Sequence, residues 1–478
     1  MKNFKILLIL TLSFSLFSCS EDFLNKDSRN NVSGDQIIDL ANSSPEAALT
    51  ITNGLESGNT LFINDFNTAG NGNIHDDFGH MAVNLGLDLM SNDMVQYQSH
   101  WFVNYYNYTA RNENSIRTDM IWKFYYKVIY NMNSILKFLP EDIANDDLRY
   151  LKARCLAMRG MAYFNLIRVY GNGTQGIPMY TESIIEPSRV ANSTIVSLIE
   201  DDLTTAHQLI DGYNRPSKVA IDKNVVSGLL ARYYLEYGNF AQAASYAAQA
   251  RTGYSPMTNL NDGFNKISNS EWMWGADINT NTSTYYASYF SHMGNSNAGY
   301  AGLLGIYKNI DKRLYDAIPS TDSRKTAWFD GPSQGLPQYA NTKYFDDTDF
   351  EGDYVFMRAA EMYLIEAEAK ALSGDETGAK QVLFDLISTR DSSYTLSTNS
   401  GANLLNEIRT HRRIELWGEG FAFYDMKRWG VELNRNYPGS NHTSFGFFDY
   451  PSASQKFIFQ IPLSEINANP TLGGQNPF

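Results

Sequence analysis

The sequence predicts a mainly α fold, a scaffold of helical hairpins with long ordered loops and few short strands. Apolar residues recur at helical spacing through many segments, as in residues 115–139, where Pro140 ends the run. Strand-like alternation is sparse, and its best cases are residues 271–274 and 457–461. Because helical periodicity dominates, packed helices are expected to enclose the core.

The remaining helices follow from the same periodicity. Residues 20–60 are expected to form a tether that leads into a first helix, and Asn, Ser and Gly are frequent there around the apolar Ile37, Ile38 and Leu40. Further helices are expected over residues 147–170, 194–210, 218–237, 240–252, 355–373, 376–390, 402–417 and 420–429.

Two of the predicted helix pairs share a spacing of small residues. Ala231, Gly238, Ala243 and Ala250 lie at intervals that recur in Ala367, Gly374 and Ala379, with Leu386 in the last place. Small side chains at these offsets let two antiparallel helices approach closely, and the glycine falls in the turn between them. This pattern is typical of tetratricopeptide-like repeats, which stack into a continuous scaffold.

The N-terminus has the features of a targeting segment. Lys2 and Lys5 precede an apolar run over residues 6–17, which is too short to span a bilayer. The sequence then reads Leu16-Phe17-Ser18-Cys19, which resembles the cleavage box of a bacterial lipoprotein. The resemblance implies that residues 1–18 are a signal peptide and that Cys19 becomes the acylated anchor to a membrane. The alternative is an ordinary secretory signal with an incidental cysteine.

Charge and composition narrow the classes of partner and cofactor. There are 38 basic and 52 acidic residues, for a net charge of -14, which argues against nucleic acid as the main partner. Two cysteines cannot build a disulfide framework, and seven histidines without an HExxH spacing do not indicate a zinc site. Residues 171–176 match a dinucleotide-binding pattern but follow a helix instead of a strand. No cofactor and no metal are therefore expected.

Aromatic residues are concentrated in two blocks that lack long helical patterns, at about 54–110 and 253–350. Aromatics make up 14% of the chain, more than a core alone requires, and both blocks combine them with Gly, Asn and Ser. Disordered segments are poor in aromatic residues. The two blocks are therefore predicted to be ordered loops that build a binding site.

The C-terminal half carries motifs that resemble one family throughout. These motifs are residues 358–369 (RAAEMYLIEAEA), 411–420 (HRRIELWGEG) and 423–430 (FYDMKRWG), preceded by 163–171 (YFNLIRVYG). They resemble the signature blocks of the SusD/RagB family, and the resemblance runs in order over residues 19–478. It implies one SusD-like domain in an outer-membrane lipoprotein that binds nutrients, mostly glycans, as the lid of a SusC-like TonB-dependent transporter.

Candidate ligand-binding residues come from the aromatic blocks. In the starch-binding member of the family, an aspartate, a tryptophan and an asparagine at a similar spacing contribute to the glycan site, and Asp76, Trp101 and Asn104 match that spacing. Sugars lay their C–H faces on aromatic rings, so further candidates are the aromatic neighbours Tyr97 and Tyr105 and the tyrosines of the second block, Tyr285, Tyr286 and Tyr300. The alternative for Trp101 is a core residue that packs on the first hairpin.

The expected function is glycan capture at the cell surface without catalysis. Glu415 and Glu419 are one turn apart beside Arg412 and Arg413, so ion pairing along the helix explains them better than a glycosidase pair does. The nearest alternative keeps the family and makes the ligand a peptide, as in the RagB branch. Two alternatives from other classes are less favoured. The sequence lacks the nucleophile motif that a secreted hydrolase would need, and a protein-binding tetratricopeptide adaptor would not need the long aromatic loops.

Overall fold

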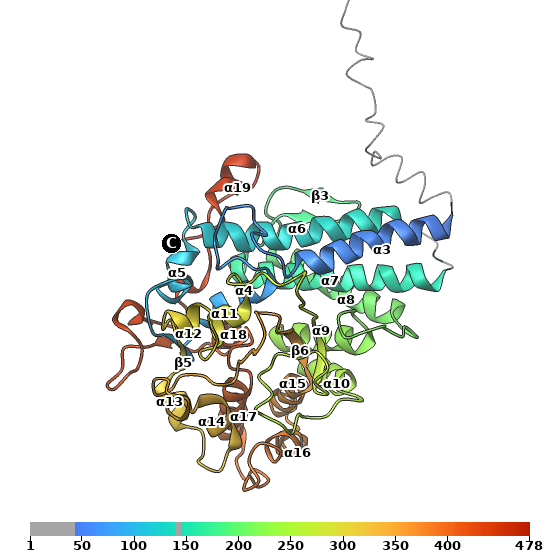
Figure 1. Ribbon diagram of the computed structural model, residues 1–478. Helices are drawn as coiled ribbons and strands as arrows, with labels where there is room; N and C mark the ends of the chain where they lie inside the picture. Colours follow the sequence, from blue (N-terminus) through green and yellow to red (C-terminus); the bar gives the residue numbers. More distant parts are fainter. Residues whose placement is uncertain (1–43, 140–142, 144) are drawn as a thin grey trace, which may run out of the picture.

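The computed structural model describes residues 44–478 apart from 140–142 and 144, and helices dominate it (Figure 1). The long helices are α3 (Pro45–Phe62), α6 (Ile116–Phe138), α7 (Asp146–Tyr170), α8 (Asn192–Leu209), α9 (Lys223–Glu236), α10 (Phe240–Ala250), α15 (Ala359–Leu372), α16 (Glu376–Ile387) and α17 (Gly401–Glu415). The predicted mainly α fold is confirmed. Of the predicted tether and first helix over residues 20–60, residues 20–43 lie outside the described residues, and α3 begins at Pro45.

Consecutive long helices pack on one another as the periodicity predicts. α3, α6 and α7 lie side by side (Figure 1), and contacts continue from α7 to α8, α9, α10, α15 and α16. Side-chain caps fix the starts: Ser115 accepts a hydrogen bond from the N–H of Arg117 in α6, and Asp222 accepts one from Val225 in α9. Because Asp222 caps α9, that helix begins later than the predicted residue 218.

The two predicted hairpins are confirmed as α9–α10 and α15–α16. Gly238 and Gly374 stand in the turns with φ angles of 83° and 90°, a left-handed conformation that other residues rarely adopt. Ala231 and Ala243 are fully buried between α9 and α10. Their small side chains permit the close approach that the spacing predicts.

Shorter elements occupy the two blocks between the long helices. The short helices are α4 (His80–Asp88), α5 (Val103–Tyr106), α11 (Tyr289–Met293), α12 (Tyr300–Leu303), α13 (Lys312–Asp316), α14 (Ser323–Phe329), α18 (Ala422–Arg428) and α19 (Leu463–Ala468). The 3₁₀ helices are η2 (Thr109–Arg111), η3 (Gly331–Gln334), η4 (Ser444–Gly446) and η5 (Gln455–Phe457). The first block, residues 54–110, also contains the last turns of α3. The prediction that this block lacks long helical patterns is therefore wrong in part.

The described strands form two-stranded antiparallel sheets. The pairs are β1 (Met94–Gln96) with β5 (Lys308–Ile310), β2 (Met179–Tyr180) with β3 (Ile185–Glu186), β4 (Trp272–Ala276) with β6 (Tyr354–Arg358), and β7 (Leu433–Asn434) with β8 (Asp449–Tyr450). The predicted strand near Trp272 is confirmed as β4. Its partner β6 occupies residues that the sequence placed at the start of a helix. The β1–β5 pair joins the two aromatic blocks.

The predicted strand at residues 457–461 is wrong. Phe457, Phe459 and Ile461 are buried, which explains the alternation, but the backbone N–H groups of Phe459 and Gln460 donate to the carbonyls of Val169 and Arg111. These acceptors lie at the end of α7 and in η2, so the segment has no strand partner. Alternating burial therefore arises here without a sheet.

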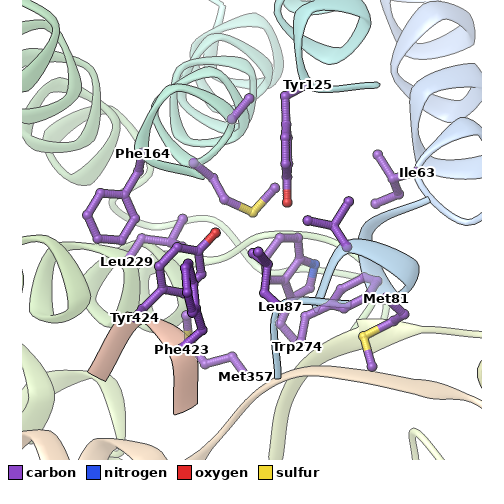
Figure 2. Packing of buried hydrophobic residues seen from close by; sticks show 14 of the residues in the cluster. Ile63, Met81, Leu87, Tyr125, Phe164, Leu229, Trp274, Met357, Phe423 and Tyr424 are labelled. Carbon is purple, nitrogen blue, oxygen red and sulfur yellow. The ribbon is translucent and has the colours of Figure 1, made fainter. Parts of the chain in front are cut away.

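One large hydrophobic cluster connects the scaffold with the inserted blocks. Figure 2 shows Tyr125 of α6, Leu229 of α9, Trp274 of β4, Met357 of β6 and Phe423 of α18 converging on the same region. Each of these side chains is less than 10% exposed. The inserted blocks are thus packed into the core of the scaffold.

A buried ion cluster surrounds Glu415 at the end of α17. Its carboxylate pairs with Arg324 and Arg358 at 2.8 Å and with Arg390 at 2.9 Å, and all four side chains are at most 1% exposed. Glu271 also pairs with Arg358 and Arg390. Burial raises the pKa of the Glu415 carboxyl, but the charges of the three arginines together hold it well below its ordinary value.

The expected helical pairing of Glu415 and Glu419 with Arg412 and Arg413 is wrong. α17 ends at Glu415, so Glu419 has left the helix and pairs with Arg358 and Lys343, each at 2.7 Å. Arg412 instead pairs with Asp425 and Arg413 with Asp93. Both glutamates remain bound to cations, but these cations come from distant parts of the chain.

Glu415→Gln is expected to destabilise the fold by about 3–5 kcal/mol, because it removes the one carboxylate that pairs with all three buried arginines and leaves an uncompensated positive charge. Urea denaturation measures the change in free energy of unfolding. Asp385→Asn, an exposed carboxylate on α16, is the control and should change that free energy by less than about 0.5 kcal/mol. Equal stability of the two variants would contradict a central role for the cluster.

Candidate ligand-binding site

Aromatic side chains of the two inserted blocks meet at one place. Trp101 of the first block and Tyr300 of the second lie edge to face, with ring centroids 6.3 Å apart. The imidazole of His75 stacks on Trp101 at 5.6 Å, with an angle of 9° between the rings. His100 contacts both Trp101 and Tyr300. The β1–β5 ladder, which pairs Gln96 with Lys308, holds the two blocks in this register.

Tyr300 is the centre of this arrangement, at the start of α12. Its ring stacks on the buried ring of His292, with centroids 4.9 Å apart, and its hydroxyl is 2.8 Å from Nδ1 of His75. The edge of Tyr286 meets Tyr300 at 6.0 Å, and Phe350 packs against the other side of Tyr286. The aromatic platform is defined here as His75, His100, Trp101, Tyr286, Tyr300 and Phe350.

Several predicted residues are open to solvent at or near the platform. Tyr286 is 48% exposed and Tyr285 is 54% exposed. Tyr285 has a φ of 51°, an unusual value for a bulky residue and a feature that often accompanies functional sites. Tyr97 is 44% exposed and packs on Tyr307. Trp101 is half-buried, so part of its indole stays accessible.

The platform is polar as well as aromatic, and its histidines are neutral at physiological pH. Burial lowers the pKa of His75 and of His100, and it lowers that of His292 well below the ordinary value. The indole Nε1 of Trp101 and Nδ1 of His292 are buried without a protein partner. Neutral imidazoles suit hydroxyl groups, which both donate and accept hydrogen bonds.

Two predicted ligand residues are removed from the candidate site by their burial. Asp76 is fully buried, and its carboxylate oxygens accept from Nε and Nη2 of Arg117 at 2.9 and 3.2 Å. Tyr105 is also fully buried, and its ring packs against Phe102. Asn104 is half-buried on α5 and donates from Nδ2 to Thr109 Oγ1 at 3.0 Å.

No local pattern in the sequence indicates the histidines near Trp101 and Tyr300. His75 precedes Asp76 and His100 precedes Trp101, so both adjoin predicted ligand residues, but no spacing distinguishes them. His292 lies in α11 within the second block. Their placement depends on the contact between the two blocks, which no local pattern predicts.

A separate groove of about 930 Å³ runs along α6, and its lining contains no member of the platform. Trp122 and Tyr126 form part of its wall, with Tyr130, Lys127 and Ile185 at exposed positions. The exposed fraction of Tyr130 is 63%, and the ammonium of Lys127 lies 4.7 Å from the centre of its ring. This groove is the second concave surface to consider for a ligand.

Comparison with known proteins identifies the family. The model described as the SusD family matches residues 263–478, and the model described as "Starch-binding associating with outer membrane" matches residues 73–235. The two matches cover most of the scaffold and most of both inserted blocks, but they leave out α3 and α10. The chain belongs to the SusD/RagB family, and the second description associates such proteins with the outer membrane.

Individual relatives agree with this assignment. SusD-like protein P25 of Formosa agariphila is 23% identical over 301 residues, and the match spans 58% of this chain and about half, 52%, of the relative. A SusD-like carbohydrate-binding protein from Bacteroides vulgatus is 26% identical with a TM-score of 0.77, over 89% of this chain and 97% of that one. A laminarin-binding SusD-like protein shares the fold, with 20% identity and a TM-score of 0.65 over 84% and 97% of the two chains.

Two features are absent from the described residues. Between residues 44 and 478, with 140–142 and 144 left aside, no helix combines the length and the apolar character that crossing a bilayer requires. The same residues contain no group of three or more His, Cys, Asp or Glu side chains placed to hold a metal ion.

Trp101→Ala is expected to lower the free energy of unfolding by only about 1–2 kcal/mol, because the indole is half-buried and loses chiefly its stack with His75. Trp274→Ala, which empties a fully enclosed position, should cost about 3–5 kcal/mol. Chemical denaturation of the two variants measures both values. A Trp101 variant as unstable as the Trp274 variant would make Trp101 a core residue.

Proposed function

We propose that this protein captures oligosaccharides or polysaccharides at the cell surface with the aromatic platform and passes them to a SusC-like TonB-dependent transporter. One observation carries the proposal: Trp101 and Tyr300, which are far apart in the sequence, form a single cluster with the exposed Tyr286. The carbohydrate-binding relative from Bacteroides vulgatus and the laminarin-binding neighbour support a glycan ligand.

The chemistry of the platform suits a sugar chain. Pyranose rings present C–H faces that pack on aromatic faces, and their rims carry hydroxyls that need hydrogen-bond partners. Trp101 and Tyr286 offer partly open rings, and His100 offers a neutral imidazole beside Trp101. Both ring nitrogens of His75 already have partners, Tyr300 and Asn73, so His75 positions the Trp101 ring. Asn104, Tyr97 and Tyr285 are proposed as flanking contacts, since each has accessible surface. Tyr300 orients the cluster and contributes its edge.

We propose a binding role without catalysis. The carboxylates of Glu415 and Glu419 are buried and paired with Arg324, Arg358, Arg390 and Lys343. Such carboxylates cannot reach a substrate or exchange protons with it. The most conspicuous pair of glutamates in the sequence therefore serves the fold.

The cellular setting is part of the proposal. Residues 1–18 would be removed and Cys19 acylated, and both lie outside the described residues. The remaining residues 19–478 would then act as one domain at the outer surface of the cell, held by lipid. The family description that mentions the outer membrane supports this location.

Tyr286→Ala is expected to weaken glycan binding about tenfold to a hundredfold, because loss of one stacking ring costs on the order of 1–3 kcal/mol, by analogy with nucleic-acid bases. A glycan and peptide array on the mature protein identifies the ligand, and titration calorimetry then measures the affinity. Tyr130→Ala in the α6 groove removes an equally large exposed ring and is the matched control. Binding lost in Tyr130→Ala alone would place the ligand in that groove, and binding to peptides alone would favour the RagB-type alternative.

Cys19→Ala is expected to abolish acylation and to release the protein from the membrane fraction, because lipid supplies the membrane affinity. In mild detergent, the acylated protein should copurify with a partner of transporter-barrel size from cells grown on its nutrient. Immunoblots of membrane and soluble fractions locate the wild-type protein and the Cys19→Ala variant. Acylation that persists in the variant would contradict the role of Cys19, and repeated recovery of the acylated protein alone would contradict the transporter complex.

A further inference from the structure

Lys308 is a buried cation without a balancing acid. Its side chain is fully enclosed, and its Nζ donates to the carbonyl of Ile306 at 3.1 Å. Within the described part of the chain, no carboxylate forms an ion pair with it. Lys343 is the useful comparison, since it is equally buried but donates to two carbonyls and to Glu419. Buried ammonium groups are costly unless paired, so the position of Lys308 requires an explanation.

The strand that carries Lys308 is connected directly to the platform. Lys308 in β5 pairs with Gln96 in β1, and the Gln96 amide donates from Nε2 to the carbonyl of Trp101 at 3.0 Å. Asn295 fixes the backbone of Lys308 through both its N–H and its carbonyl group. Lys308 therefore belongs to the rigid layer that positions Trp101.

Other polar atoms in the same layer lack protein partners. Oε1 of Gln96, Nε1 of Trp101 and Nδ1 of His292 are all buried without a hydrogen bond. Most buried polar atoms in native proteins are paired with protein or water. One of these atoms belongs to Gln96, the β1 partner of Lys308, so the layer that holds Lys308 contains polar groups that the described residues leave unpaired.

The charged groups around Lys308 leave its positive charge unopposed. His100 and His292 face it, and its charge adds to burial in lowering the pKa of each. Asp76 is neutralised by Arg117. At the ends of the two strands, Asp93 pairs with Arg413, and Asp311 is bound by Arg313, Tyr437 and His442. The acidic residues 346–353 adjoin Phe350 at the other edge of the platform.

We propose that the platform selects glycans that carry carboxylate or sulfate groups, and that the charge of Lys308 in the adjoining strand β5 sets this preference. The inference rests on the proposed function and names its substrate class. Inside protein the effective dielectric constant is low, so a charge acts on a ligand across a few ångströms without direct contact. An acidic sugar on the platform supplies the negative charge that no carboxylate of the layer supplies.

Because anion binding is coupled to protonation of Lys308, the preference for acidic glycans should depend on pH. Burial lowers the pKa of Lys308 to about 7, so the free protein is only partly charged there near neutral pH. A bound anion favours the ammonium form and raises that pKa, so binding takes up a proton. Affinity for acidic glycans should therefore be full below pH 7 and fall as the pH rises from 7 toward 9. The histidines, with lowered pKa values, are neutral throughout this range.

The experiment compares matched polysaccharides on the mature protein. An array presents uronate and sulfated polysaccharides, each beside its own carboxyl-reduced or desulfated neutral form. We expect the acidic form of the bound glycan to bind about tenfold more tightly, with proton uptake seen by calorimetry in buffers of different ionisation enthalpy. Equal binding of both forms without proton uptake would overturn the inference and leave glycan capture intact. Binding to no glycan would overturn both.

Lys308→Met tests the residue itself. The variant should fold with equal or greater stability, because a buried unpaired charge is lost. It should bind the neutral form as before, while the tenfold preference and the pH dependence disappear. Lys127→Met removes an exposed lysine in the α6 groove and should change neither. A Lys308 variant that keeps the preference would overturn the inference, and if it fails to fold, proton uptake by the wild-type protein decides.

Discussion

The ion cluster around Glu415 is the constraint on which the rest of the architecture depends. It joins Arg324 of α14, Arg358 at the end of β6 and Arg390 after α16 to the last residue of α17. These segments come from the second inserted block and from the C-terminal hairpins. Because removing one member leaves uncompensated charges in the interior, the cluster disfavours arrangements of block and scaffold that separate its members. A long loop rich in Gly, Asn and Ser is thereby held in one conformation.

The fixed second block then determines where the first one lies. The β1–β5 ladder and the contact of Trp101 with Tyr300 attach residues of the first block to it. His75 reinforces the contact by stacking on Trp101 and meeting the Tyr300 hydroxyl. The platform is thus preorganised, so a ligand bound there would cost the protein little conformational entropy. The scaffold supplies rigidity, and the inserted blocks supply the chemistry.

Local patterns in the sequence predict the scaffold well and the site only in part. Helix limits follow from periodicity and from caps such as Asp222, and the hairpin turns follow from Gly238 and Gly374. Strand β6, the strand wrongly predicted near Phe459, and the partners of Glu415 depend on residues distant in the chain, so local spacing cannot reveal them. The same holds for the platform: Trp101, Tyr286 and Tyr300 are conspicuous as aromatic residues, but the burial of Asp76 and Tyr105 depends on tertiary contacts.

The central claim is that the ligand lies on the platform formed by the two inserted blocks. A crystal structure of the mature protein with its oligosaccharide tests this claim most directly. The account predicts a sugar ring packed on Trp101 or Tyr286, with hydroxyls within hydrogen-bonding distance of the neighbouring histidines. Sugar bound only in the groove along α6, beside Tyr130, with the platform empty, would contradict it.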